Sequence, residues 1–370
     1  KSDSISLDNE GNFVVGSGRN IKFWGTSLGY ETLYPPKEVA EKIAKRLDKF
    51  GFNLVRIASL DATIFDNGFD DTQHFDSNKL DRFDYLVSQL KKQGIYIDLV
   101  ITGKRRFRAG DKVKDWNSSQ FKNSYIGRRL LRSMTFIDSR LQKLQEEYAE
   151  EILSHRNPYT KNKYSNEPAV AMIEIFNETT LDIGWMRDML NVNSPESPRV
   201  TQYYSTKLDR LWIEWLKNKY GSSEELRKSW KGPGGKKGML HDESLEKGNI
   251  KRILFSNRNK FTEKRLEDLQ LFYHQIQKKY FRSFTNYLRR DLDVNVPISG
   301  SHTFHGLTHL KAQNATDFTG MHVPWEHPLT GQGSWKNAKL INTPMVKSES
   351  APKPPHGDWI ESDNTLYKMA

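Results

Sequence analysis

The segment PAVAMIEIFNE at residues 168–178 constrains the fold of this chain more than any other stretch. Residues 169–176 are mainly apolar and too few for a typical helix, and Pro168 marks their start, so the pattern predicts a buried strand. If that strand is parallel to its neighbours, Asn177 and Glu178 lie at the carboxyl edge of a sheet. α/β barrels carry their chemistry at that edge, and a carboxyl group partly shielded from water suits general acid or base catalysis. From this segment alone, a strand that merely ends in polar residues is an equal alternative.

The composition is that of a soluble protein with a substantial core, because 36% of the 370 residues are hydrophobic and 28% are charged. This length allows one large domain or two smaller ones. No apolar run approaches the ~20 residues that span a bilayer, and the sequence as given opens on a polar stretch without a signal peptide. Cysteine is absent, which excludes disulfides, thiol nucleophiles and zinc–thiolate sites.

The net charge of +11 suggests nucleic acid or an anionic polymer as a partner. However, the basic residues are spread along the chain among 46 acidic ones, and no nucleic-acid-binding motif is present, so we expect no nucleic acid. Aromatic residues in polar, turn-rich segments are better suited to stacking on sugar rings. The best candidates for that role are Trp116, Trp185 and Trp325.

Strand-like and helix-like segments alternate along the chain. The predicted strands lie at 21–28, 52–58, 95–101, 168–176, 297–302 and 317–323. The predicted helices lie at 39–50, 80–90 and 141–155, the last capped by Asp138, with helix-rich regions at 200–230 and 262–292. A hairpin at 12–24 precedes the first strand. Repeated strand–helix units imply an α/β fold with parallel strands joined by right-handed crossovers.

A barrel and a doubly wound sheet both fit this alternation, and two features favour the barrel. Polar side chains suited to chemistry follow several different strands, as barrels require. They are Arg56, Asn177, Glu178, His302 and His322. No GxGxxG motif follows the first strand and no GK[ST] phosphate loop occurs, so we expect no nucleotide cofactor. No His/Asp/Glu set has metal-ligand spacing, so we expect no metal either.

Six motifs, in order over most of the chain, resemble the clan A glycoside hydrolases, the cellulase-like (β/α)8 barrels. The likeness is greatest to the family 5-like polysaccharide hydrolases that bacteria secrete. The motifs are FWGTS (23–27), NLVRI (53–57), IDSRL (137–141), NPYT (157–160), NEPAVAMIEIFNE (166–178) and WEHP (325–328). The resemblance implies one catalytic barrel over residues 1–370, with a hairpin at 1–20 closing its bottom. It also implies a secreted or periplasmic monomer that hydrolyses a polysaccharide or oligosaccharide without a cofactor.

The resemblance assigns roles to particular residues in a retaining mechanism with two carboxylates. Glu178 is the expected acid/base, and Asn177 would hydrogen-bond the 2-hydroxyl group of the sugar. Arg56 would hold the nucleophile ionised and oriented, and His322 would lie near it. The expected substrate-binding residues are Trp116, Trp185, Trp325, Arg105 and His302.

A second Asn-Glu pair, Asn166-Glu167 before Pro168, looks more like the Asn-Glu-Pro signature of these enzymes. It precedes the predicted strand, so it would lie at the amino end, away from the catalytic edge. We therefore choose Glu178 as the acid/base.

The nucleophile is the point at which this sequence departs from the family pattern. In the resembling proteins it is a Glu at the end of the seventh strand, and the candidate here is Glu349, which ends the strand-like segment 344–349. The preceding segment, 336–342, is a poor crossover helix. We therefore favour a chain that stops before the seventh and eighth units, with Glu349 as the alternative nucleophile.

The loop GKRRFRAG at 103–110 carries four cations around Phe107 and follows the third strand. It could bind an acidic or sulfated glycan, because Arg pairs well with carboxylates and sulfates. We favour the alternative, a solvated loop with one Arg packed structurally. The competing function is a non-catalytic carbohydrate-binding protein on a degenerate or incomplete barrel.

Overall fold

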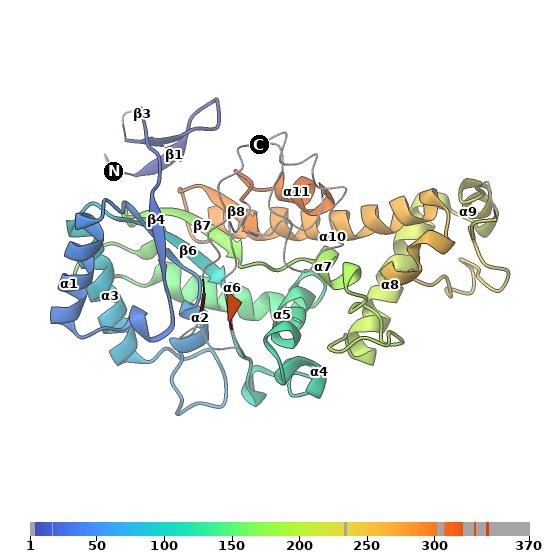
Figure 1. The fold of residues 1–370 in the computed structure, drawn as a ribbon, viewed down its shortest axis with the longest axis horizontal. Helices are drawn as coiled ribbons and strands as arrows, with labels where there is room; N and C mark the ends of the chain where they lie inside the picture. The colour runs from blue at the N-terminus through green and yellow to red at the C-terminus, as the bar shows by residue number, and fades with distance from the viewer. Residues whose placement is uncertain are drawn as a thin grey trace.

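Five parallel strands form the central sheet of the computed structural model, which describes residues 4–16, 18–232, 235–301, 307–320, 329–330 and 338–339. The strands lie in chain order, and every neighbouring pair is parallel. They are β4 (Gly25–Leu28), β5 (Leu54–Ile57), β6 (Tyr96–Thr102), β7 (Val170–Phe176) and β8 (Ile298–Ser301). Their carboxyl ends therefore meet at one edge, which leads into α2, α5 and α7 in Figure 1.

The two central strands are buried along almost their whole length. Every residue of β7 is buried, and in β6 only Tyr96 is half-buried. Strands covered on both faces are mainly apolar without strict alternation, which is the pattern of 169–176 in the sequence. The predicted parallel α/β sheet is confirmed. Of the predicted sixth strand, the described part contributes a parallel bridge between Ser299 and Phe318.

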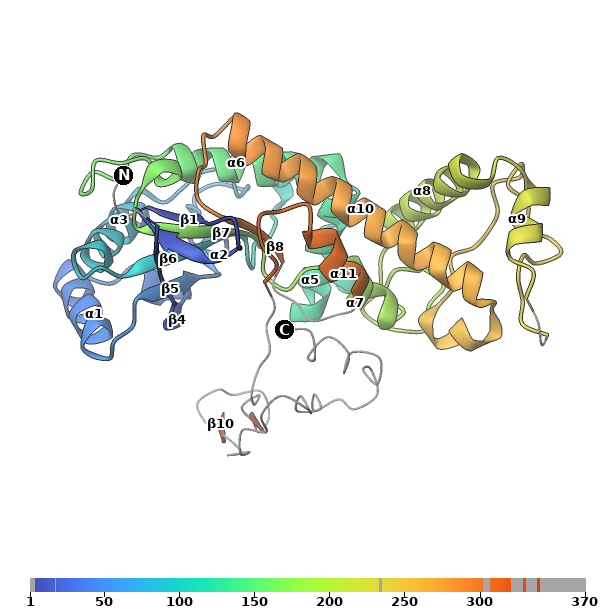
Figure 2. The ribbon, with the colours of Figure 1, turned by 90° about the horizontal axis from the view of Figure 1, so that it is seen from above.

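The long helices follow the strands and cover one side of the sheet (Figure 2). They are α1 (Lys37–Lys49), α3 (Ser77–Lys92), α6 (Ser139–Ser154) and α10 (Glu263–Arg290). The first three coincide with the helices expected at 39–50, 80–90 and 141–155, because helical spacing of apolar residues is a strong local signal. Their apolar faces and the strands share one core.

Short helices and two further strand pieces complete the described elements. The helices are α2 (Leu60–Thr63), α4 (Ser119–Lys122), α5 (Tyr125–Ser133), α7 (Leu181–Met186) and α11 (Leu307–Gln313). The 3-10 turns are η1 (Tyr30–Leu33), η2 (Ala109–Asp111), η3 (Met134–Phe136), η4 (Tyr164–Asn166) and η5 (Phe255–Lys260). Strands β9 (Leu329–Thr330) and β10 (Ala338–Lys339) pair antiparallel.

A small antiparallel sheet packs on the amino ends of the parallel strands. It consists of β1 (Ile5–Leu7), β2 (Phe13–Val15) and β3 (Arg19–Asn20). Its side chains form a second apolar cluster with residues at the starts of the parallel strands, Leu54, Tyr96 and Met172. Ile21 and Phe23 belong to this cluster, so the first parallel strand begins at Gly25 and not at residue 21 as predicted.

Between β7 and β8 the chain builds a helical lobe that projects from the sheet (Figures 1 and 2). The lobe consists of α8 (Gln202–Tyr220), α9 (Ser223–Ser229) and the first half of α10. Its centre is Asp268, fully buried, which accepts hydrogen bonds from Lys219 Nζ (2.7 Å), Trp230 Nε1 (2.8 Å) and the Tyr220 hydroxyl. Two of these donors come from α8 and the third from Trp230, just after α9. The buried charge therefore fixes these two parts of the lobe to α10.

The N-terminus of α6 provides a stability test. The Asp138 carboxylate accepts from the backbone N–H groups of Arg140 (3.1 Å) and Leu141 (3.2 Å), and also from Lys207 Nζ (2.8 Å). At α3, Asp76 accepts in the same way from Asn78 and Lys79. We expect Asp76→Ala to cost about 1 kcal/mol and Asp138→Ala about 2 kcal/mol, because Asp138 also loses a charged partner.

Urea denaturation of both variants measures these differences. Asp138→Asn is the control, because it keeps the capping Oδ1 and loses the charged Oδ2 that accepts from Lys207 and Tyr203. Equal costs for Asp76→Ala and Asp138→Ala would contradict a contribution from Lys207.

Candidate active site

Glu178 lies immediately beyond β7, at the carboxyl edge of the sheet, and its backbone adopts an unusual conformation. Its φ angle is 48°, in the left-handed region that residues with a Cβ seldom enter. The flanking backbone is held from both sides: Asn177 N donates to Thr102 O (2.9 Å), and Thr179 N donates to Ser301 Oγ (3.0 Å). Neighbouring strands β6 and β8 thus enforce the strained conformation. Strain of this kind persists where the surroundings over-determine it and clusters at functional sites.

Arg56, on β5, joins the buried acids of the next two strands, Asp98 on β6 and Glu174 on β7. Its Nε and Nη2 donate to Glu174 Oε2 at 2.9 and 2.5 Å, and Nε lies 3.4 Å from Asp98 Oδ2. Burial alone would lower the pKa of Arg56, but the charges of Glu174 and Asp98 raise that pKa above its ordinary value. The guanidinium is therefore fixed and fully charged inside the sheet.

The same guanidinium orients Asn177. Arg56 Nη2 donates to Asn177 Oδ1 at 3.0 Å, and the Asn177 side chain is buried. The amide oxygen is thereby engaged, which leaves the amide N–H group as the donor for a ligand. Glu174 and Asp98 escaped the sequence analysis, because a charged residue inside an apolar strand gives no local indication of its partner.

Arg129, on α5, contacts the candidate acid/base. Its Nη1 lies 3.7 Å from Glu178 Oε2, and the side chains are 13% and 36% exposed. Glu178 therefore remains accessible to a ligand while one side faces a cation. Sequence reasoning missed Arg129, although Arg128-Arg129 in a short amphipathic helix was a readable signal.

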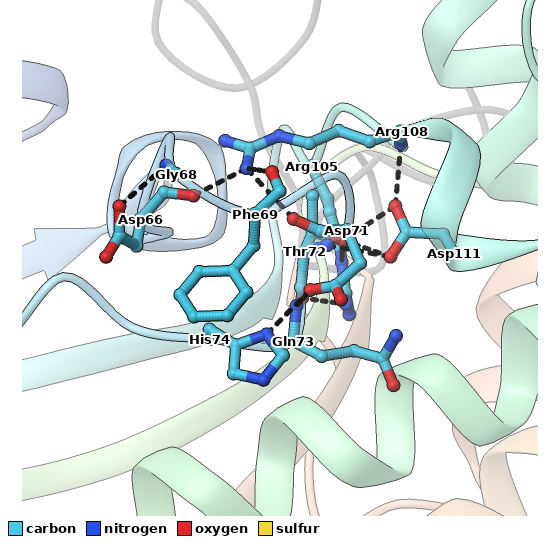
Figure 3. A network of polar contacts seen from close by, with 10 residues as sticks. All are labelled: Asp66, Gly68, Phe69, Asp71, Thr72, Gln73, His74, Arg105, Arg108 and Asp111. Atoms are coloured by element: carbon cyan, nitrogen blue, oxygen red, sulfur yellow. Dashed lines mark hydrogen bonds and ion pairs between the residues drawn. The ribbon is translucent and has the colours of Figure 1, made fainter.

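Arg105, expected to bind substrate, is buried and hydrogen-bonded within the protein (Figure 3). It is 4% exposed, and its guanidinium donates to Thr72 Oγ1 (2.8 Å), Leu144 O (2.6 Å) and the Thr72 carbonyl. Arg108 likewise donates to three carbonyl oxygens of the loop at 66–71. These two cations of the 103–110 loop hold loops together, which corrects the substrate role given to Arg105.

Trp185, expected as a sugar platform, is also differently placed. Trp185 is 6% exposed, its Nε1 donates to Ile253 O (2.8 Å) and its ring packs edge-on against Phe255. The helical lobe covers it, so it has no free face for a sugar. Trp116 is half-buried against the core. The remaining predicted site residues lie outside the described residues; they are His302, His322, Trp325 and Glu349.

Glu167, of the second Asn-Glu pair, lies at the opposite end of β7. It is 2% exposed and contacts Lys91 Nζ at 2.6 Å, while Ala169 N donates to Oε1 at 3.1 Å. Burial raises the pKa of Glu167, but these contacts outweigh burial and lower it below the ordinary value of 4.5. Glu167 is thus a structural anion.

The lowered pKa of Glu167 predicts a pH-dependent contribution to stability. A depressed folded-state pKa stabilises the protein above pH 4.5, and that contribution is lost as the pH falls through the folded-state pKa. We expect Glu167→Gln to lower the free energy of unfolding by about 1–3 kcal/mol at pH 7. The difference from wild type should shrink below pH 4.5. Urea titrations at several pH values measure it, and a constant difference would contradict the charge-based explanation.

No group of three His, Cys, Asp or Glu side chains in the described part of the chain is arranged to hold a metal ion. No helix among the described residues is long and apolar enough to span a membrane.

A parallel α/β sheet with a strained glutamate at its carboxyl edge, next to an asparagine held by an arginine, has the arrangement of α/β enzymes whose chemistry lies at that edge. The cellulase family, glycosyl hydrolase family 5, matches residues 14–203, just over half of the chain. The chain therefore belongs to glycosyl hydrolase family 5 and is a glycosidase. This confirms the resemblance drawn from the motifs. No curated protein sequence matches the chain.

Solved structures similar to this chain include three mannanases. The β-mannanase of the blue mussel Mytilus edulis is 14% identical, with 99% of this chain and 88% of that chain covered and a TM-score of 0.41. The endo-1,4-β-mannanase of Rhizomucor miehei is 13% identical, with coverage of 81% and 82% and a TM-score of 0.38. The β-1,4-D-mannanase of Cryptopygus antarcticus is 14% identical, with coverage of 90% and 74% and a TM-score of 0.36. At TM-scores below 0.5 this likeness adds nothing to the family match.

Proposed function

We propose that this chain hydrolyses a polysaccharide or oligosaccharide with retention of anomeric configuration, and that Glu178 is the acid/base. The observation that carries the proposal is the placement of Glu178 in a strained conformation at the carboxyl end of β7, beside an Asn177 held by Arg56. In the first step Glu178 donates a proton to the leaving glycosidic oxygen. In the second it removes a proton from water, which releases the glycosyl group from a carboxylate nucleophile.

The remaining polar groups have roles that follow from their contacts. The Asn177 amide N–H group would donate to the sugar 2-hydroxyl, a contact that strengthens in the transition state. Arg56 positions Asn177 through the 3.0 Å contact to Oδ1. The second carboxylate, about 5–5.5 Å from the acid/base in retaining enzymes, would come from outside the described residues, where Glu349 lies.

We further propose that the five strands are the first five of a (β/α)8 barrel. Their consecutive parallel order, the helices along one side and the bridge from Ser299 to Phe318 support it. An experimental structure in which further parallel strands close onto β4 would agree with the proposal. A sheet left open, or a strand order that changes direction, would contradict it.

Two measurements test the reaction. Release of reducing ends from a panel of β-glucans, β-mannans and charged polysaccharides identifies a substrate. Proton NMR of the first product then shows which anomer forms before mutarotation. Retention is expected. Inversion would contradict the two-carboxylate double displacement, and binding without hydrolysis across the panel would favour a carbohydrate-binding protein.

A further inference from the structure

Four arginines lie in the connections that follow β6 and β7 at the carboxyl edge of the sheet. Arg128 and Arg129 lie on α5, Arg187 immediately follows α7, and Arg106 lies in the loop after β6. Arg129 reaches to 3.7 Å from Glu178 Oε2. Two connections, one after β6 and one after β7, therefore carry these arginines, and Arg129 reaches the side chain that would act on the glycosidic bond.

The charged neighbours of these arginines are other arginines. Burial and then Arg106 lower the pKa of Arg128, and burial and then Arg129 lower the pKa of Arg187. Among the described residues, no carboxylate opposes either effect. Arg106 with Arg128 and Arg129 with Arg187 thus form two like-charge pairs, and Arg129 of the second pair contacts Glu178.

These arginines differ from their neighbours in how their donors are used. Arg105 and Arg108 give their N–H groups to protein oxygens, as Figure 3 shows for the loop at 66–74. Arg106 and Arg187 are exposed, and neither donates a side-chain hydrogen bond to another described residue, whereas Arg128 Nη1 donates to Lys122 O at 2.8 Å. Repulsion between clustered cations costs stability, so a set with unused donors indicates an anion-binding role.

A cavity extends from this cluster. Its volume is about 320 Å³, the lower end of the range for small-molecule sites. Ile126 on α5, one turn before Arg129, forms one wall, while Met186, Arg187 and Phe255 form another. Two acids line the cavity. The Asp188 carboxylate accepts hydrogen bonds from the backbone N–H groups of Phe255 and Ser256, and Glu196 is exposed to solvent.

We propose that the substrate is an anionic glycan, whose carboxylate or sulfate groups bind Arg187 at the cavity and Arg106 with Arg128 in the connection after β6. The inference rests on the proposed function and adds the substrate class. Arginine suits this role because its planar fork of N–H donors matches the oxygens of a carboxylate or sulfate group. Anionic groups would also neutralise the two like-charge pairs, so binding relieves the repulsion.

Direct binding tests this without requiring turnover. Isothermal titration of Glu178→Gln protein with length-matched neutral mannan, polymannuronate and sulfated galactan oligosaccharides separates neutral, carboxylate and sulfate ligands. We expect one anionic ligand to bind at least about tenfold more tightly than the neutral one. Arg187→Gln or Arg106→Gln, added to that protein, should each weaken the anionic ligand about tenfold and leave the neutral one unchanged.

Arg19→Gln is the matched control, because Arg19 is exposed on β3 at the other end of the strands. Equal affinity for neutral and anionic ligands, or an equal loss in Arg19→Gln, would overturn the proposal. The outcomes distinguish a failure of the anionic-substrate proposal from a failure of the proposed hydrolysis. Hydrolysis of a neutral glycan unaffected by Arg187→Gln would reject the anionic substrate and keep the enzyme. Arginine-dependent binding of an anionic glycan that wild type never cleaves would reject the reaction and keep the site.

Discussion

Glu178→Gln is expected to lower kcat by about 10²- to 10⁴-fold on whichever glycan the wild-type protein hydrolyses. Glutamine keeps the size of the side chain and cannot transfer the proton, so the affinity for substrate should change little. Initial rates of reducing-end release and a titration of the same oligosaccharide measure the two effects. Because the Glu178 side chain is 36% exposed, the fold should survive the substitution.

The choice of leaving group separates an acid/base from a nucleophile. A glycoside with an acidic phenol as leaving group needs little proton donation, so glycosyl transfer to the enzyme should remain fast in Glu178→Gln. A burst of phenol followed by slow turnover is therefore expected. Loss of the burst together with turnover would contradict the acid/base role and indicate that Glu178 attacks the sugar itself.

Glu167→Gln is the matched control from the same strand. Glu167 lies at the amino end of β7 with Lys91, away from the carboxyl edge, so its substitution should reduce stability and leave kcat unchanged. If Glu167→Gln abolished turnover in a folded protein, the assignment of the catalytic end of the sheet would be wrong.

The strand ending in Asn177-Glu178 could be predicted because its signals are local. A short buried apolar run, a proline at its start and polar residues at its end lie within one segment of the sequence. The Asp138 cap was predictable for the same reason, since capping joins a side chain to the backbone two or three residues later. The direction of this strand then indicates that Glu178, and not Glu167, lies at its carboxyl end.

Contacts between distant segments could not be predicted in this way. Arg129 meets Glu178 through α5, a short helix inside a long connection, and no local pattern indicates that this helix lies against the end of β7. Trp185 lies in a polar, turn-rich segment, which suggests an exposed ring. Instead, the ring is buried by residues from further along the chain, and its Nε1 donates to the carbonyl of Ile253. Arg105 was predicted to face a ligand, and instead Thr72 and Leu144 take its donors.

Arg56→Met should produce the largest loss of stability, about 3–5 kcal/mol in the free energy of unfolding. The substitution removes the positive charge that contacts Glu174 and Asp98, whose side chains are 0% and 4% exposed. Burying those charges without this cation costs more than the methionine side chain gains by packing. Thermal and urea unfolding monitored by circular dichroism measure the loss.

A second substitution tests whether charge is the cause. In Arg56→Met/Glu174→Gln, one of the two carboxylates is neutral, so part of the lost stability should return. Arg56→Lys is the complementary control, because it keeps the charge and loses the fork that reaches Glu174 and Asn177 together. It should lose less stability than Arg56→Met and still impair catalysis, since Asn177 Oδ1 loses its 3.0 Å donor. If Arg56→Met/Glu174→Gln were no more stable than Arg56→Met, packing rather than charge would be the main contribution of Arg56.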